Sequence, residues 1–196
     1  MRLIKIFSLI FAMAILFCSQ VQASPLQVAR LPIIFQSNKP DSNTCAILET
    51  KLARAVNVPL NGTLKLVEYI EPAKSTAALN EIWRQLRRVN KNAKLKNAMR
   101  LLSDKLNADI IVCPILRQYS EQRLPTAMTL ESHLVSVAAA TLIVYDRRTN
   151  DLVEKKFTRQ FNGNYNRFGT ASALAIECFD RLIQSTKLRQ KFMAIK

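Results

Sequence analysis

The chain has 196 residues, a formal net charge of +15 and a pI of about 10.1. Its single histidine and three glycines exclude a histidine-rich metal centre and a glycine-rich phosphate loop. So positive a charge favours a polyanionic partner, such as anionic lipid, acidic glycan or nucleic acid, or else serves only solubility.

The N-terminus has the pattern of a secretory signal peptide. Arg2 and Lys5 are positive, residues 6–17 are apolar, and residues 21–23 supply a cleavage site. We predict cleavage after Ala23 and export to the periplasm or cell envelope. The alternative is an uncleaved anchor, although the apolar run is shorter than the ~20 residues that span a bilayer.

A lipoprotein signal fits less well, because Phe17 stands before Cys18 where a small residue is required. Cleavage removes two cations and no acid, so the +15 of the whole chain becomes +13 for residues 24–196. This length suffices for one α/β domain with a core of its own. Export makes nucleic acid an unexpected partner.

The first part of the exported chain predicts strand, helix and strand. Residues 30–35 form the first expected strand, with Pro32 at a strand start or edge because proline has no N–H for the ladder. Apolar residues at helical spacing predict a helix over 44–56, which ends before Pro59. The second strand is expected over 64–70.

Two helices then lead into the central strand. We expect the first to be capped by Ser75 or Thr76 and the second to cover residues 94–106. Residues 109–116 (DIIVCPIL) are nearly all apolar and rich in β-branched side chains. A run without a polar face predicts a strand that is covered on both sides.

The remaining sequence predicts a hairpin and a last helix. Residues 120–126 are interpreted as an exposed loop, and strands over 131–145 and 152–161 flank a turn. The last helix starts near Thr170. The order β-α-β-α-α-β-β-β-α predicts an α/β (α+β) fold, with a single mixed sheet of about five strands and helices on both faces.

Three cysteines follow the cleavage site, at Cys45, Cys113 and Cys178. Their odd count and wide spacing do not suit a disulfide framework. Cys113, in the central strand, is expected to be a free buried thiol. The other two either pack as small apolar residues or form a bridge between two helices.

The sequence offers little for catalysis. His133 has no partner that spacing specifies, so we interpret it as a polar strand residue rather than a general base. Turn and solvent-facing roles explain two possible carboxylate pairs better than catalysis does; they are Glu68 with Glu71 and Asp146 with Asp151. We therefore predict no enzymatic activity, no cofactor and no metal site.

Positive charge is concentrated on consecutive helices. Arg84, Arg87, Arg88 and Lys91 stand at i, i+3, i+4 and i+7, which places them on one helix face, opposite an apolar stripe. Further cations follow in the next predicted helix, where Asp104 is the single acid. The candidate polyanion- or partner-binding residues are Arg84, Arg87, Arg88, Lys91, Lys94, Lys96 and Arg100. Four cations at about 1 kcal/mol each would give reversible, salt-sensitive binding to an anionic membrane surface. The alternative is a solvated helix face.

Three segments resemble a group of bacterial envelope domains. Residues 30–38 (RLPIIFQSN) look like the first strand and loop of this group, and 102–116 (LSDKLNADIIVCPIL) like its helix and central strand. Residues 139–157 (AATLIVYDRRTNDLVEKKF) look like its hairpin. The group contains the curli secretion lipoprotein CsgG, lipoproteins that regulate peptidoglycan synthases, and the amino-terminal domain of TolB.

This resemblance implies an envelope protein without catalytic residues. The chain departs from CsgG because it has no cysteine after a proper lipobox and no clear membrane-spanning hairpin, so an accessory or scaffold role fits better than a pore. The leading hypothesis is a non-enzymatic exported domain that docks another envelope component, most simply a protein, through its basic helices or sheet edge. The alternative is a reversible binder of an anionic membrane surface, glycan or other polyanion.

Overall fold

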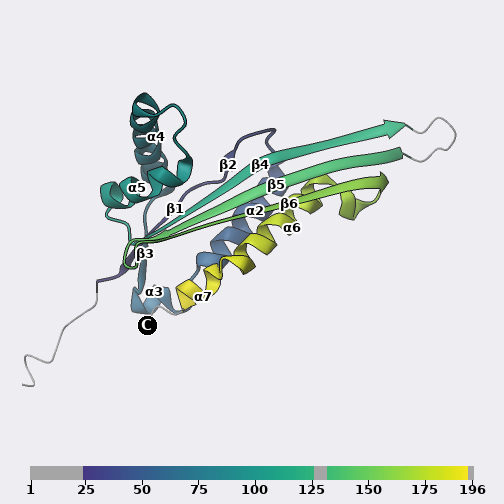
Figure 1. The fold of residues 1–196 in the computed structure, drawn as a ribbon. Coiled ribbons are helices and arrows are strands. Elements are labelled where there is room, and N and C mark those ends of the chain that lie inside the picture. The colour runs from purple at the N-terminus through teal and green to yellow at the C-terminus, as the bar shows by residue number, and fades with distance from the viewer. Residues whose placement is uncertain (1–23, 126–131, 194–196) are drawn as a thin grey trace, which may run out of the picture.

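The computed structural model describes residues 24–125 and 132–193, so the predicted signal peptide lies outside the described residues. A six-stranded mixed sheet has the order β3-β1-β4-β5-β6, with β2 beside β4 (Figure 1). The strands are β1 (Leu26–Arg30), β2 (Ile34–Phe35), β3 (Val67–Tyr69), β4 (Ile110–Pro125), β5 (Ser132–Asp146) and β6 (Asp151–Asn164). The predicted α/β class with a single mixed sheet is confirmed.

Helices lie on both faces of the sheet, as predicted. The helices are α2 (Ser42–Val56), α3 (Asn61–Leu64), α4 (Pro72–Val89), α5 (Ala98–Leu106), α6 (Ala171–Ser185) and α7 (Leu188–Met193), with 3-10 turns η1 (Leu95–Asn97) and η2 (Arg167–Gly169). Buried residues of α2, α6 and α7 form one core cluster with the sheet, and those of α4 and α5 form a second. Figure 1 shows α4 and α5 near one end of the long strands.

The central strand β4 is covered on both sides. It pairs in parallel with β1 and β2 and antiparallel with β5. Ile110 and Val112 belong to the cluster beneath α2 and α6, whereas Ile111 and Cys113 belong to the cluster beneath α4 and α5. All four side chains are fully buried, because alternate residues of a strand face opposite layers.

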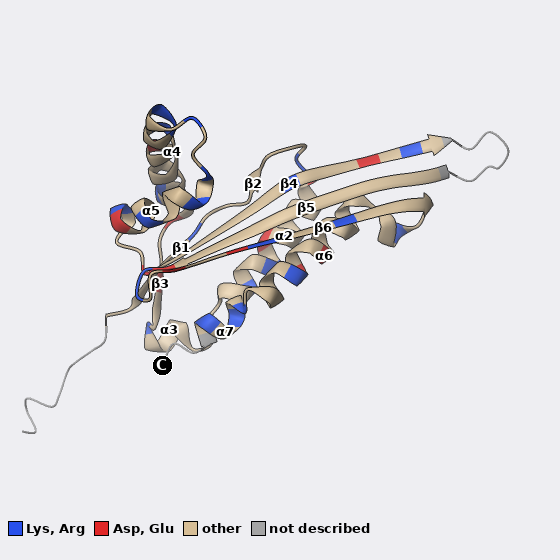
Figure 2. Cartoon of the chain, viewed as in Figure 1, with Lys and Arg blue, Asp and Glu red and all other residues tan. Residues whose placement is uncertain are grey.

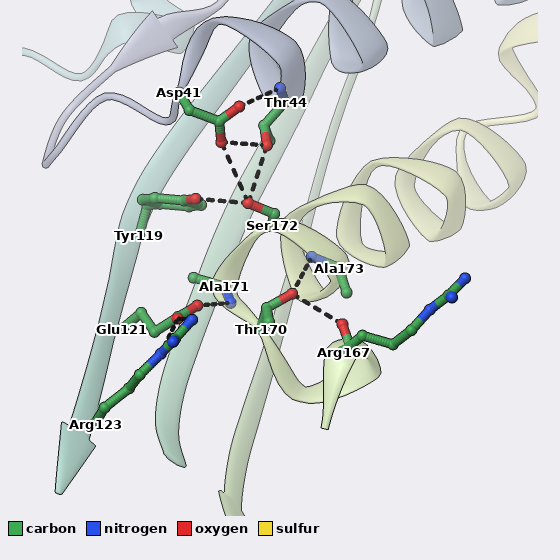
Figure 3. A network of polar contacts seen from close by, with 10 residues as sticks. All are labelled: Asp41, Thr44, Tyr119, Glu121, Arg123, Arg167, Thr170, Ala171, Ser172 and Ala173. Carbon is green, nitrogen blue, oxygen red and sulfur yellow. Dashed lines mark hydrogen bonds and ion pairs between the residues drawn. The ribbon is translucent and has the colours of Figure 1, made fainter. Parts of the chain in front are cut away.

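Polar contacts at the start of α6 fix that helix to the sheet (Figure 3). The Thr170 hydroxyl accepts a hydrogen bond from the Ala173 N–H at 3.3 Å. Glu121 of β4 accepts another from the Ala171 N–H at 2.9 Å. These acceptors satisfy N–H groups that a helix leaves free in its first turn.

The same network ties α6 to α2. The Ser172 hydroxyl lies 2.8 Å from that of Tyr119 and 2.9 Å from that of Thr44 (Figure 3). Asp41 caps α2 by accepting from the Thr44 N–H at 2.9 Å. Hydrogen bonds from the Thr44 hydroxyl and N–H lower the pKa of Asp41. The network therefore fastens α2, α6 and β4 together.

The prediction of an exposed loop over residues 120–126 is wrong for residues 120–125, and residue 126 lies outside the described residues. Strand β4 continues to Pro125, and its pairing with β5 extends as far as Pro125 and Ser132. The polar composition of this segment indicated a loop. Cross-strand pairing overrides composition here, because β5 supplies a continuous hydrogen-bonding partner.

The first two strands also differ from their predicted bounds. Strand β1 starts earlier, at Leu26, and the chain leaves the ladder at residues 31–33 before β2. Pro32 lies in that interruption, in line with its missing N–H. The second strand is shorter than predicted because α3 occupies its first residue, Leu64.

The helix predicted to follow Ser75 or Thr76 starts instead at Pro72. Proline suits a first helical turn because its fixed φ is helical and the N–H that it lacks is not needed there. The next predicted helix, over 94–106, is divided between η1 and α5.

All three cysteines are free, so the bridge considered between Cys45 and Cys178 does not form. Cys113 is fully buried, as predicted, and burial raises its pKa to about 12. Burial also raises the pKa of Cys178 to about 11. Both thiols therefore stay protonated at neutral pH.

Replacing Gly169 with alanine is expected to destabilise the fold by about 1–3 kcal/mol, as overpacking does. A Cβ at Gly169 would lie 2.6 Å from Cε1 and Cγ of the Phe161 ring. Urea unfolding measures the loss. The matched change Gly62→Ala meets nothing within 4 Å and lies in α3, so it should be neutral or stabilising. Equal effects at the two glycines would contradict this expectation.

Candidate functional site

A groove of about 510 Å³ lies between α4, the connection from α4 to α5, and the sheet. We call it the basic groove. Its apolar lining comes from β1–β2, α4, η1, β4 and β5, namely Leu31, Ile34, Leu79, Trp83, Leu95, Ile115 and Ile143. All seven belong to the cluster beneath α4 and α5 or pack against it: Leu31, Leu79, Ile115 and Ile143 are members, and Ile34, Trp83 and Leu95 pack against them. The groove is thus an uncovered margin of that core.

Cations surround this apolar surface. The basic residues that line the groove are Arg87, Lys94, Lys96, Arg117 and Lys156. The acid that lines it is Glu154, which pairs with Lys156 at 3.1 Å and with Lys96 at 3.7 Å. Arg117 and Lys94 form no side-chain ion pair or hydrogen bond with any part of the chain that the structure describes. The groove therefore keeps an excess of positive charge.

A β-bulge places Arg117 at the groove. The pairing of β4 with β5 shifts from Leu116–Ala140 to Gln118–Ala139, which leaves Arg117 as the extra residue. A bulge of this kind bends a strand and redirects a side chain. Here the redirected side chain is a cation at the end of the fully apolar part of β4.

Trp83 and Arg87 form one wall of the groove. The Arg87 guanidinium carbon lies 5.6 Å from the centroid of the Trp83 ring, and Nη1 donates to the Lys91 carbonyl at 3.0 Å. Stacking and this hydrogen bond limit the rotamers of Arg87. The wall thus presents an aromatic ring with a cation fixed over it.

Thr141 of β5 is a buried polar side chain in the lining of the groove. It is only 2% exposed, and Oγ1 has no hydrogen-bond partner among the described residues. Its neighbour two residues away, Ile143, lies on the same face and belongs to the cluster beneath α4 and α5. An unpaired buried hydroxyl costs about 1–3 kcal/mol, so its partner is expected to come from outside the chain.

The structure brings together only part of the predicted basic set. Arg87, Lys94 and Lys96 line the groove, whereas Arg84, Arg88, Lys91 and Arg100 do not. These four are exposed, and Figure 2 shows Lys and Arg gathered along α4 and the connection that follows it. We call Arg84, Arg88 and Lys91 the outer basic surface.

Sequence reasoning missed Arg117, Lys156 and Thr141 as groove residues. Lys156 lies opposite Thr141 in the pairing of β5 and β6, and no local signal in the sequence places this part of β6 beside α4. Arg117 depends on a bulge, and no turn or glycine signal in the sequence marks it. The lone clue is that Arg117 directly follows the apolar run.

Other polar candidates have structural partners. His133 contacts the Asn162 side-chain oxygen on the neighbouring strand, and Gln27 donates to Glu68 at 2.6 Å. Asp146 pairs with Arg148 at 2.7 Å. Burial acts to raise the pKa of Asp146, but the hydrogen bonds and charge of Arg148 outweigh it and the pKa is lowered.

Within residues 24–125 and 132–193, no group of three or more histidine, cysteine or carboxylate side chains could hold a metal ion. Among these residues, no helix is both long enough and apolar enough to cross a membrane.

No family model matches this sequence, and no curated protein matches it. Solved structures with some similarity include the PelC dodecamer from Paraburkholderia phytofirmans, at 18% identity over 85% of this chain and 89% of that chain, with a TM-score of 0.40. Hypothetical protein CT253 from Chlamydia trachomatis has 12% identity over 83% of this chain and 96% of that chain, with a TM-score of 0.44. Lipoprotein GNA1162 from Neisseria meningitidis has 13% sequence identity over 85% of this chain and 99% of that chain, with a TM-score of 0.35. Values this low assign no family and no function.

Proposed function

We propose that this chain is a non-enzymatic exported domain that docks a negatively charged component of the cell envelope through the outer basic surface. The observation that carries the proposal is that exposed cations without ion pairs in the described chain are clustered at the C-terminal end of α4 and just after it. Within the described residues, Arg84, Arg88 and Lys91 form no ion pair. Clustered like charges repel one another, and an anionic partner would remove that repulsion.

Two further points support docking rather than catalysis. The polar groups considered for chemistry, such as His133 and Asp146, are engaged in contacts that hold strands and the hairpin together. The predicted signal peptide would deliver the domain to an envelope whose membranes carry anionic lipids. A membrane surface and an acidic envelope protein are the two kinds of component that this charge suits.

Sedimentation with vesicles tests the proposal. The protein should pellet with vesicles that contain anionic lipid and remain in solution with neutral ones, and added salt should release it, because salt screens exposed charges. Without vesicle binding, capture of an acidic envelope protein by the wild-type domain, lost on charge reversal, would identify a protein component instead. If charge reversal on the outer basic surface changes neither interaction, the proposal is wrong.

A further inference from the structure

The basic groove has a chemistry that docking on the outer surface does not use. We propose that the groove binds an anionic amphiphile, a molecule that joins one apolar chain to a phosphate or carboxylate head group. The proposal goes beyond docking, because it concerns side chains of the sheet as well as α4 and a ligand that enters the groove.

The apolar lining selects the body of the ligand. The half-buried side chains of Ile34, Trp83 and Leu95 present apolar surface to the groove, and the buried side chains of Leu31, Leu79 and Ile143 complete the apolar lining. These apolar side chains offer no hydrogen bonds, so the part of a ligand that lies on them must itself be apolar. Gln36, Thr76 and Asn80 add polar groups to the lining. A hydrocarbon chain needs no hydrogen bonds and gains from leaving water. The volume of about 510 Å³ lies in the range of ~300–1,000 Å³ that small-molecule sites occupy.

The cations select the head group. Arg117 and Lys94 have no partner in the described chain, and both reach the groove from different elements. A guanidinium can bind a phosphate or carboxylate through two parallel hydrogen bonds. Glu154 partly neutralises Lys96 and Lys156 but forms no ion pair with Arg117 or Lys94. An anionic head group would therefore pair with Arg117, with Lys94 or with both.

Thr141 gives an independent indication of a ligand. Its hydroxyl is buried at the groove without a partner, although a valine would fill the same space at no such cost. The oxygen of a bound head group, or an ordered water beneath it, would provide the missing hydrogen bond. Ser136 of the same strand also has a buried hydroxyl without a partner but does not line the groove, so the indication depends on the position of Thr141 at the groove.

The single tryptophan of the chain, Trp83, lines the groove and reports on binding without a label. Titration with dodecyl phosphate below its micelle concentration should give a saturable blue shift of tryptophan emission. The neutral detergent dodecyl maltoside should bind at least about tenfold more weakly, because it lacks the charge that pairs with arginine. Equal affinity for the two, or an emission change that does not saturate, overturns the proposal.

Variants separate this site from the outer basic surface. Arg117→Gln should weaken dodecyl phosphate binding about tenfold, and Lys94→Gln, at an exposed position, tests the same head-group site if the first variant folds poorly. Arg181→Gln, on α6 beyond the opposite face, should leave the affinity unchanged. A loss with Arg181→Gln equal to that with Arg117→Gln also overturns the proposal.

The two proposals fail separately. Two results together support two distinct sites. Vesicle binding should survive Arg117→Gln, and dodecyl phosphate binding should survive charge reversal at Arg84, Arg88 and Lys91. Loss of dodecyl phosphate binding on that triple reversal, with unchanged thermal stability, would mean that charge on α4 alone attracts the detergent, and the groove proposal would fall.

Discussion

Reversing three charges on the outer basic surface is expected to abolish binding to anionic vesicles. The variant carries Arg84→Glu, Arg88→Glu and Lys91→Glu. A basic residue near an anionic surface contributes about 1 kcal/mol, so three removed cations and three added acids together cost ~6 kcal/mol. This corresponds to a fall of about four orders of magnitude in the binding constant. Sedimentation would then find the variant in solution at every lipid concentration tested.

A control with the same change in net charge is available on the opposite layer. Arg54, Arg181 and Arg189 are exposed, form no ion pair within the described residues, and lie on α2, α6 and α7. Their reversal should reduce vesicle binding far less, because only long-range attraction is lost and salt screens it over about 8 Å at physiological ionic strength. If both triple variants bind equally weakly, total charge and not the outer basic surface governs binding.

The same experiment requires a folded variant. Arg84 and Arg88 lie on exposed turns of α4 and Lys91 lies just after the helix, whereas the buried contacts of α4 come from residues such as Leu79 and Ile82. Arg84 also donates to the Asn80 carbonyl at 3.3 Å, an exposed contact of small energetic value. The midpoint of thermal unfolding should therefore change little, and a large drop would make the vesicle result a consequence of unfolding.

How far the sequence predicts this molecule depends on the range of the interactions involved. The burial of Ile110, Ile111 and Val112 follows from their own apolarity, so the central strand was predicted correctly. The interruption at residues 31–33 and the extension of β4 to Pro125 depend on the partners of each strand. Those partners lie far along the chain, and local composition carries no information about them.

The candidate site shows the same limit. The sequence predicted that Arg84, Arg87, Arg88 and Lys91 share one helix face by their spacing, but α4 ends at Val89, so Lys91 lies beyond the helix. The groove arises where α4 meets β4 and β5, and Arg117 enters it because one residue is inserted in the pairing of those strands. Thr141 reads in the sequence as an ordinary strand residue. Its missing partner becomes evident only when both neighbouring strands and the helix layer are in place.

A pair of substitutions in β4 tests whether the central strand is covered on both sides. Ile110→Ala opens a cavity beneath α2 and α6, and Ile111→Ala opens one beneath α4 and α5. Both side chains are 0% exposed, so each change should lower the free energy of unfolding by about 2–5 kcal/mol. Urea denaturation measures both losses.

Val89→Ala is the matched control, because that side chain is 90% exposed at the end of α4 and its truncation should change stability by no more than about 0.5 kcal/mol. The two isoleucine variants should behave alike, since the helix layers shield successive residues of one strand. A small loss at either position would mean that one layer does not cover the strand. For Ile111, that outcome would remove the packed surface from which the basic groove is built, since Leu79 and Ile143 belong to the same cluster.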